Sequence, residues 1–124
     1  KAAVTGKFRN NGQVCISPSR FFVHKDVQKK FTEVAVEEAK KLKLGNGLDE
    51  GVVVGPIIAQ ARLDATRDLV ADATAKGAKC LTGGKRPAGL DRGYFIEPTI
   101  LSGLSPDAKI LTEEPFAPVM PVLD

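Results

Sequence analysis

The chain is poor in the residues that build metal sites, disulfide frameworks and nucleic-acid interfaces. Among its 124 residues there are two Cys, one His, one Tyr and no Trp. A single His and no Cys-x-x-Cys pair argue against a zinc site, so we expect no bound metal. The net charge of +3 is small, whereas nucleic-acid binding needs a denser basic stripe, with aromatics for single strands. We therefore expect no nucleic-acid partner.

Long apolar runs are absent as well. No stretch of about 18 apolar residues is present to cross a membrane, and the first residues lack the apolar core and cleavage site of a secretory signal. Cys15 and Cys80 stand in unlike contexts, without the several cysteines of a disulfide framework. A reducing, cytoplasmic setting fits best. The chain has no initiating Met, and residues 119–124 resemble a strand that has just begun, so we expect a fragment of a longer protein.

What is present is an ordinary globular composition for one domain, with 43% hydrophobic and 27% charged residues. Apolar residues at helical spacing and β-prone runs predict the secondary structure. The expected helices cover residues 26–42 and 60–76, and the expected strands cover 20–24, 79–82, 94–101 and 119–124. Strands that alternate with helices predict an α/β fold, a three-layer sandwich around a mostly parallel sheet.

Local signals predict how these elements begin and end. Asp26 can cap the first helix. Gly45 stands where a helix C-terminus favours positive φ, and Gly77 closes the second helix. Pro98 interrupts the strand at 94–101, which predicts an edge position or a bend.

Residues 8–18, rich in Asn, Gly, Gln and Ser, surround Cys15 and predict a loop or a turn into a helix. A free Cys is more often a small buried apolar residue than a nucleophile, so both interpretations of the bare residue stay open. Gly12 would let the backbone approach a ligand closely. Ser17 and Pro18 indicate a turn, whose amides could stabilise a thiolate and an oxyanion.

A longer pattern around this cysteine carries a resemblance. The segment Lys7-Phe8-Arg9-Asn10-Asn11-Gly12-Gln13-Val14-Cys15, followed by Arg20, resembles the cysteine signature of the aldehyde dehydrogenase superfamily, F-x-N-x-G-Q-x-C with Arg five positions later. Further matches in the family's order cover essentially the whole chain: Gly55-Pro56, Gly83-Gly84-Lys85, Glu97-Pro98-Thr99-Ile100-Leu101 and Glu113-Glu114-Pro115-Phe116-Ala117-Pro118.

The resemblance implies a reaction in which Cys15 is the nucleophile and NAD or NADP the cofactor. The thiolate adds to a small-molecule aldehyde, hydride leaves to the nicotinamide, and water releases a carboxylic acid from the thioester. It also implies that residues 1–124 are the catalytic, cysteine-bearing domain. The dinucleotide-binding domain, the general-base Glu, the oxyanion Asn and the oligomerisation strand are absent from them. We expect these residues alone to be inactive, and the full-length protein to form a homo-oligomer.

The segment 113–118 resembles the family's E-E-x-F-G-P loop. There the second Glu hydrogen-bonds the nicotinamide ribose and the Phe packs by the nicotinamide ring, roles that fall on Glu114 and Phe116. From composition alone, these residues read as a surface charge and a core side chain. Ala117 replaces the family's usual Gly; if that position required positive φ, Ala would cost about 1 kcal/mol.

Arg9 is the clue to the substrate. It resembles the Arg of members that oxidise succinate semialdehyde, where it contacts the distal carboxylate, and a guanidinium matches a carboxylate bidentately. The alternatives are a structural ion pair for Arg9 and another acidic or simple aldehyde, such as 2-oxoglutarate semialdehyde. A different class of function also stays open: a non-catalytic interaction module that keeps the fold.

The remaining expectations concern placement. Ligands of parallel sheets bind at the carboxyl ends of the strands, so we expect Cys15 there, beside a cleft that Glu114 and Phe116 share. Cys80 is expected in the core. His24 is expected to be structural rather than catalytic.

Overall fold

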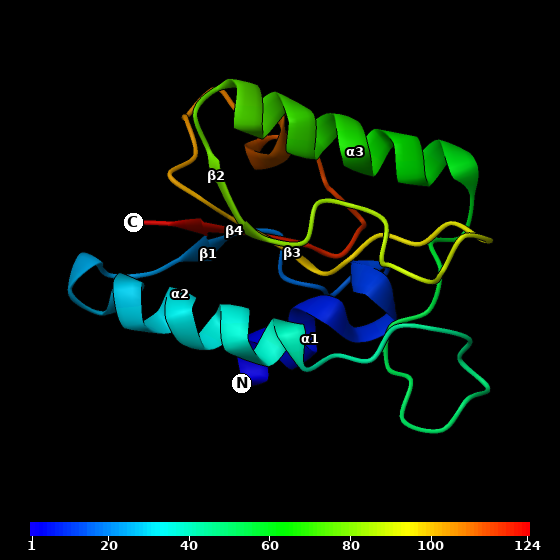
Figure 1. The fold of residues 1–124 in the computed structure, drawn as a ribbon. Coiled ribbons are helices and arrows are strands. Elements are labelled where there is room, and N and C mark those ends of the chain that lie inside the picture. Colours follow the sequence, from blue (N-terminus) through cyan, green and yellow to red (C-terminus); the bar gives the residue numbers. More distant parts are fainter.

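The computed structural model describes all residues, 1–124, as a four-stranded sheet with helices on both faces (Figure 1). In Figure 1, α3 (green) lies above the sheet, and α1 and α2 (blue and cyan) lie below it. The elements in chain order are α1 (Ala2–Phe8), η1 (a 3₁₀ turn, Arg9–Gly12), β1 (Phe21–Phe22), α2 (Lys25–Lys40), α3 (Gln60–Ala75), β2 (Lys79–Thr82), β3 (Thr99–Ser102), η2 (a 3₁₀ turn, Lys109–Leu111) and β4 (Val119–Leu123). The expected α/β sandwich is confirmed. No helix is long and apolar enough to cross a bilayer.

The sheet has the strand order β1-β4-β3-β2. β4 is parallel to both β1 and β3, whereas β2 pairs antiparallel with β3, so the sheet is mostly parallel with one antiparallel edge. The expectation of an edge position for the strand near Pro98 is wrong, because β3 is paired on both sides. Pro98 precedes the first paired residue, Thr99, and its missing N–H therefore costs the sheet no hydrogen bond.

A hydrophobic core fills the space between the sheet and the helices on each of its two faces. The strands contribute to both cores because successive strand residues point to opposite faces. Leu101 and Val119 face α3 and η2, in a core that includes Leu69, Val70, Ala73, Ala78, Ala108, Ile110 and Ala117. Ile100, Met120 and Val122 face α1 and α2, in a core that includes Val4, Phe8, Ala35 and Ala39.

The helix ends differ in part from the expected ones. His24, not Asp26, is the N-cap of α2: its Nδ1 accepts the backbone N–H of Asp26 at 3.4 Å. Asp26 instead lies in the first turn, where its carboxylate interacts favourably with the positive end of the helix dipole. α2 ends at Lys40, so Gly45 does not close it; its N–H donates to the Val54 carbonyl at 3.1 Å. Gly77, at φ +94°, does follow α3 as predicted.

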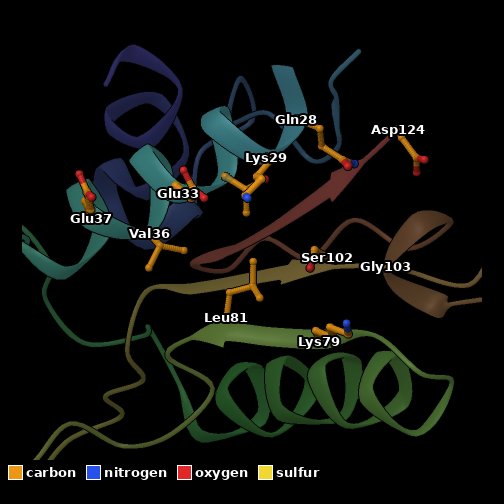
Figure 2. Close-up of a pocket in the computed structure, with 11 residues that line it drawn as sticks. Gln28, Lys29, Glu33, Val36, Glu37, Lys79, Leu81, Ser102, Gly103 and Asp124 are labelled. Carbon is orange, nitrogen blue, oxygen red and sulfur yellow. The ribbon is translucent and has the colours of Figure 1, made fainter. Parts of the chain in front are cut away.

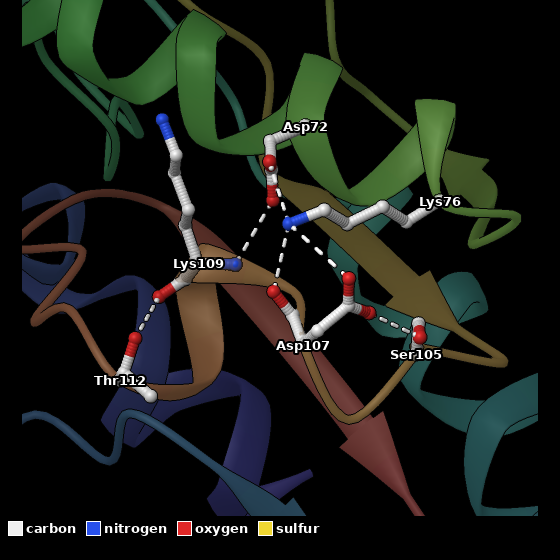
Figure 3. Close-up of polar contacts among 6 residues, drawn as sticks. All are labelled: Asp72, Lys76, Ser105, Asp107, Lys109 and Thr112. Atoms are coloured by element: carbon white, nitrogen blue, oxygen red, sulfur yellow. Dashed lines mark hydrogen bonds and ion pairs between the residues drawn. The ribbon is translucent and has the colours of Figure 1, made fainter.

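A polar network ties α3 to the segment that leads into η2 (Figure 3). The Lys76 ammonium lies 2.9 Å from the Asp72 carboxylate and donates to the Asp107 carbonyl at 2.7 Å. Asp72 accepts the Lys109 N–H at 2.9 Å, and Ser105 donates to the Asp107 carboxylate. The Lys109 N–H and the Lys76 ammonium lower the pKa of Asp72. The network fixes the start of residues 109–118 on the sandwich.

Leu101→Ala tests whether the α3-side core carries stability. Leu101 is fully buried in the central strand β3, so its truncation should lower the free energy of unfolding by about 3 kcal/mol, measured by urea denaturation. Leu48, which is 93% exposed, supplies the control: Leu48→Ala should change it by less than about 0.5 kcal/mol. Equal losses in the two variants would contradict the assigned core.

Candidate active site

Cys15 lies in a turn between η1 and β1. The Ser17 N–H donates to the Val14 carbonyl at 2.9 Å and closes the turn, while the Ser17 hydroxyl donates to the Lys7 carbonyl at 3.3 Å. The Cys15 residue is exposed and its thiol is free. An exposed thiol on a hydrogen-bonded turn is accessible to a substrate, which favours the nucleophile over the buried apolar interpretation.

Gly12 brings this cysteine turn against the acidic-proline loop, residues 113–118. A Cβ at Gly12 would lie 2.3 Å from the carbonyl oxygen of Ala117, and φ at Gly12 is +68°. The close approach that Gly12 allows is therefore to the backbone of Ala117, and not to a ligand as we expected. Because no side chain fits in this gap, the two segments can meet only at a glycine.

The residue with positive φ in the acidic-proline loop is Phe116, one position before Ala117, where positive φ was considered. Ala117 is fully buried and does not have positive φ, so it carries no left-handed penalty; Phe116 does, with φ +39°. A bulky residue in this region costs of the order of 1–3 kcal/mol and is typical of functional sites. The backbone strain therefore lies at the residue for which the resemblance implies a cofactor contact.

A second contact joins the same two segments. Arg20, just before β1, donates to the Leu111 carbonyl at 2.7 Å. A small cavity of about 180 Å³ is lined by Ser19 and Arg20 from one segment and by Glu113 and Glu114 from the other. Residues that follow Cys15 therefore share a hollow with Glu114, but neither Cys15 nor Phe116 lines it.

The site lies at the opposite edge of the sheet from the one we expected. The cysteine turn precedes β1 and the acidic-proline loop precedes β4, and these strands are parallel. Both segments therefore lie at the amino ends of these strands. The expectation that Cys15 lies at the carboxyl ends of the strands is wrong. That rule describes loops that follow strands, whereas here the loops that precede them carry the site. None of the five described cavities is lined by Cys15, so the cleft expected beside it stays a prediction.

The segment 55–58 anchors the cysteine turn from a third direction. The amide Nδ2 of Asn11 donates to the carbonyls of Gly55 and Pro56 at 2.7 and 2.8 Å. The Gln13 side-chain oxygen accepts the Ile58 N–H at 3.1 Å. Asn11 is left-handed, at φ +58°, a conformation that Asn tolerates better than most residues. Asn11 had no predicted role of its own, although two Asn residues before a Gly are a signal for left-handed backbone.

Arg9 is exposed and none of the ion pairs of the chain includes it, which disfavours the structural ion pair. It lines a hollow of about 370 Å³ whose other lining residues are mainly apolar: Thr5, Phe8, Asn10, Leu42, Val53 and Val54. The guanidinium is therefore available to an anionic ligand.

Cys80 is exposed, not in the core as we expected, because β2 is the edge strand. Its sulfur nevertheless lies near the carbonyls of Thr82 and Gly83, at 3.4 and 3.8 Å. Desolvation of the sulfur raises the pKa of the Cys80 thiol, which disfavours the reactive thiolate. Exposure alone does not distinguish the two thiols, but this environment favours Cys15.

The largest described hollow lies elsewhere. A groove of about 700 Å³ runs between α2 and the edge of the sheet at β2 and β3. Figure 2 shows side chains of α2, such as Glu33 and Val36, opposite Lys79 and Leu81 of β2. Its lining includes none of Arg9, Cys15 and Glu114, so the groove is separate from the candidate site.

Comparisons with known proteins match the chain to one family. The model of the aldehyde dehydrogenase family matches residues 1–124. A succinate-semialdehyde dehydrogenase [NADP(+)] of Schizosaccharomyces pombe is 42% identical over 95% of the chain and 24% of its own length. The crystal structure of succinate-semialdehyde dehydrogenase from Burkholderia pseudomallei is 44% identical, with a TM-score of 0.92 over 98% of this chain and 25% of that one. Betaine aldehyde dehydrogenase from Staphylococcus aureus in complex with NAD+ is 36% identical, with a TM-score of 0.92 over 98% and 24% of the respective chains.

The chain spans about a quarter of the length of the curated relatives it matches. The match thus covers a region that carries the cysteine turn and the acidic-proline loop, and not the relatives' whole length.

Gly12→Ala tests the contact with Ala117. The added methyl group would overlap the Ala117 carbonyl at a left-handed position, so the two segments must separate. Urea denaturation should show a loss of at least about 2 kcal/mol in the free energy of unfolding. Gly47, where nothing lies within 4 Å of an added Cβ, supplies the control, and Gly47→Ala should leave the stability nearly unchanged. A Gly12→Ala variant as stable as Gly47→Ala would disprove the contact.

Proposed function

The chain belongs to the aldehyde dehydrogenase family, and we propose that its full-length protein oxidises an aldehyde to a carboxylic acid with Cys15 as the nucleophile. The observation that carries the proposal is the placement of an exposed cysteine turn against the loop that holds Glu114 and Phe116. These segments are distant in sequence, and a merely structural cysteine would not require this arrangement.

Cys15 performs the covalent chemistry. Its thiolate adds to the carbonyl carbon, and the C=O electron pair moves onto oxygen to give a thiohemiacetal anion. As the C=O bond re-forms, hydride leaves the same carbon and a thioester remains on Cys15. Water then adds to the thioester, and the carboxylic acid leaves as the thiol is released. The sulfur is needed because its addition creates an electron-rich centre from which hydride can leave.

The acidic-proline loop fits a nicotinamide dinucleotide, NAD or NADP, which supplies the hydride acceptor when bound. Glu114 is exposed and lies next to the cysteine segment, so its carboxylate can accept hydrogen bonds from ribose hydroxyls. Phe116 is half-buried in a strained conformation, which suits a ring held against a flat ligand. We propose these two residues as the cofactor contacts. The relatives' names, which include NADP(+) and NAD+, support the cofactor class.

For the substrate, we propose succinate semialdehyde or a related acidic semialdehyde. The unpaired Arg9 guanidinium, six positions before Cys15, could bind the distal carboxylate while the aldehyde meets the sulfur. Succinate-semialdehyde dehydrogenases among the relatives support this choice, whereas other relatives are betaine aldehyde dehydrogenases by name. We also propose that residues 1–124 lack the dinucleotide-binding domain and do not turn over alone.

Replacing the two cysteines separately tests the nucleophile. In the full-length enzyme, Cys15→Ala should lower kcat/KM for aldehyde oxidation by a factor on the order of 10⁴ or more, because no other group can form the thioester. Reduction of NAD(P)+ followed by absorbance measures it. Cys80→Ala is the matched control and should stay within about twofold of the wild type. Activity that survives in Cys15→Ala and disappears in Cys80→Ala would reverse the assignment.

Arg9→Ala tests the substrate class. A charge-assisted hydrogen bond contributes about 1.5–3 kcal/mol, so kcat/KM for succinate semialdehyde should fall about 10- to 150-fold. The value for butanal, which has no carboxylate, should change little. Arg92→Ala, at an exposed position, serves as the control for loss of a positive charge. Equal losses for both aldehydes would show that Arg9 supports the turn instead.

A further inference from the structure

Arg20 is an exposed cation that the proposed reaction does not use. It follows Cys15 in the chain and directly precedes β1, and none of the ion pairs includes it. Its guanidinium instead donates a hydrogen bond to the Leu111 carbonyl at 2.7 Å, across 91 positions of sequence. A charged donor makes such a bond stronger than one between neutral groups. Arg20 therefore joins the cysteine segment to the last residue of η2.

The Arg20 bond and the Gly12 contact lie at opposite ends of the same pair of segments. Gly12 meets the carbonyl of Ala117, and Arg20 meets the carbonyl of Leu111. Residue numbers rise along one segment while those of the partners fall along the other, so the two segments run in opposite directions. Their two contacts close a ring of backbone.

The residues assigned to the proposed reaction all lie inside this ring. Cys15 stands between the two contacts on residues 12–20, and Glu114 and Phe116 stand between them on residues 111–117. The Arg20 bond is the only hydrogen bond that joins the two segments. The separation of the thiol from the proposed cofactor contacts is therefore set by the two ends of the ring.

At one end the ring is held by packed backbone, and at the other it is held by the hydrogen bond. Gly12 and Ala117 are both buried where they meet. Arg20 and Leu111 both line two hollows, of about 180 and 350 Å³, so other side chains do not fill the space around their contact. Without the Arg20 bond, the two segments would be joined at the Gly12 end alone.

Leu111 is itself held on the sandwich, so its carbonyl is a fixed point for the guanidinium. The Lys109 carbonyl accepts the N–H groups of Thr112 and Glu113 at 3.0 and 2.8 Å, which closes a tight turn around Leu111. The Lys109 N–H donates to the Asp72 carboxylate of α3 at 2.9 Å (Figure 3). The cysteine segment is thus tied to a turn that is anchored on α3.

We propose that Arg20 is a positioning residue that holds Cys15 in register with Glu114 and Phe116, so that hydride leaves toward the nicotinamide. The proposal rests on the cofactor roles of these two residues proposed above. Arg20 acts through the backbone of the two segments and not on the reacting atoms. A displacement of the order of 1 Å between reacting groups can slow a reaction about 100-fold, so one remote hydrogen bond can control the rate.

A purely structural role for Arg20 makes a different prediction. A surface bond that only stabilised the fold would lower the melting temperature when it is removed, and the folded enzyme would keep its rate. Arg86 supplies the matched comparison, because its guanidinium also donates to a backbone carbonyl, that of Leu90, at 2.7 Å. Arg86 and Leu90 both lie outside the ring.

The test is the rate of hydride transfer in a single turnover of the full-length enzyme, with butanal and whichever of NAD+ and NADP+ the wild type reduces. Both are saturating, so weaker binding does not enter, and alkylation of Cys15 counts the active sites. Arg20→Met keeps the stem without the donor and should slow hydride transfer about 10- to 100-fold. Arg86→Met should stay within about twofold of the wild type. Arg20→Lys keeps one donor and should stay within about tenfold.

Three results would overturn the proposal. The first is Arg20→Met as fast as Arg86→Met. The second is Arg20→Lys slower than about tenfold, which keeps the test decisive if Arg20→Met fails to fold. The third is equal slowing by Arg20→Met in the wild type and in a Glu114→Gln background, because the effect should be smaller where the positioned contact is already lost. If Glu114→Gln alone keeps the wild-type rate, the cofactor role of Glu114 fails and this inference fails with it.

Discussion

The contact between the Gly12 backbone and the Ala117 carbonyl is the constraint on which the site depends. It joins a segment that precedes β1 to one that precedes β4, and the parallel pairing of these strands brings both to one edge of the sheet. Any Cβ at Gly12 would drive them apart, because both its φ and the space around it suit glycine alone. The relation between Cys15 and Glu114 is therefore a consequence of backbone packing.

This packing requires unfavourable backbone conformations and the burial of a charge, and the surrounding structure offsets them. Asn10, Asn11 and Phe116 have left-handed backbones, and Lys7 is a buried cation. The Asn11 amide offsets part of the strain through its hydrogen bonds to the Gly55 and Pro56 carbonyls. Both sheet faces are covered by apolar cores, which supply the rest. Strain concentrated within a few residues of an exposed thiol is typical of a site preorganised for a ligand.

Much of the fold could be predicted, because its signals are local. The apolar positions of α3, the β-prone run of β2 and the positive φ of Gly77 depend on neighbouring residues, and the structure has them where the sequence placed them. The sequence motifs also predicted the family correctly.

The features that the sequence did not predict depend on tertiary contacts. The short helix α1, with a Gly inside it, has weak intrinsic propensity and is held by packing on α2 and β4. Cys80 was expected in the core because the sequence does not reveal that β2 is an edge strand. The role of Gly12 could not be foreseen either, because its neighbour Ala117 is remote in sequence.

The central claim is that Cys15, and no other residue, carries the acyl group during turnover. The most direct measurement is mass spectrometry of the full-length enzyme, quenched in acid after mixing with aldehyde and NAD(P)+ and then digested. We predict that the peptide with Cys15 gains the mass of the substrate's acyl group only when both aldehyde and cofactor are present, while the peptide with Cys80 stays unmodified. An active enzyme that accumulates the acyl group on Cys80 or another residue, with Cys15 unmodified, would contradict the account.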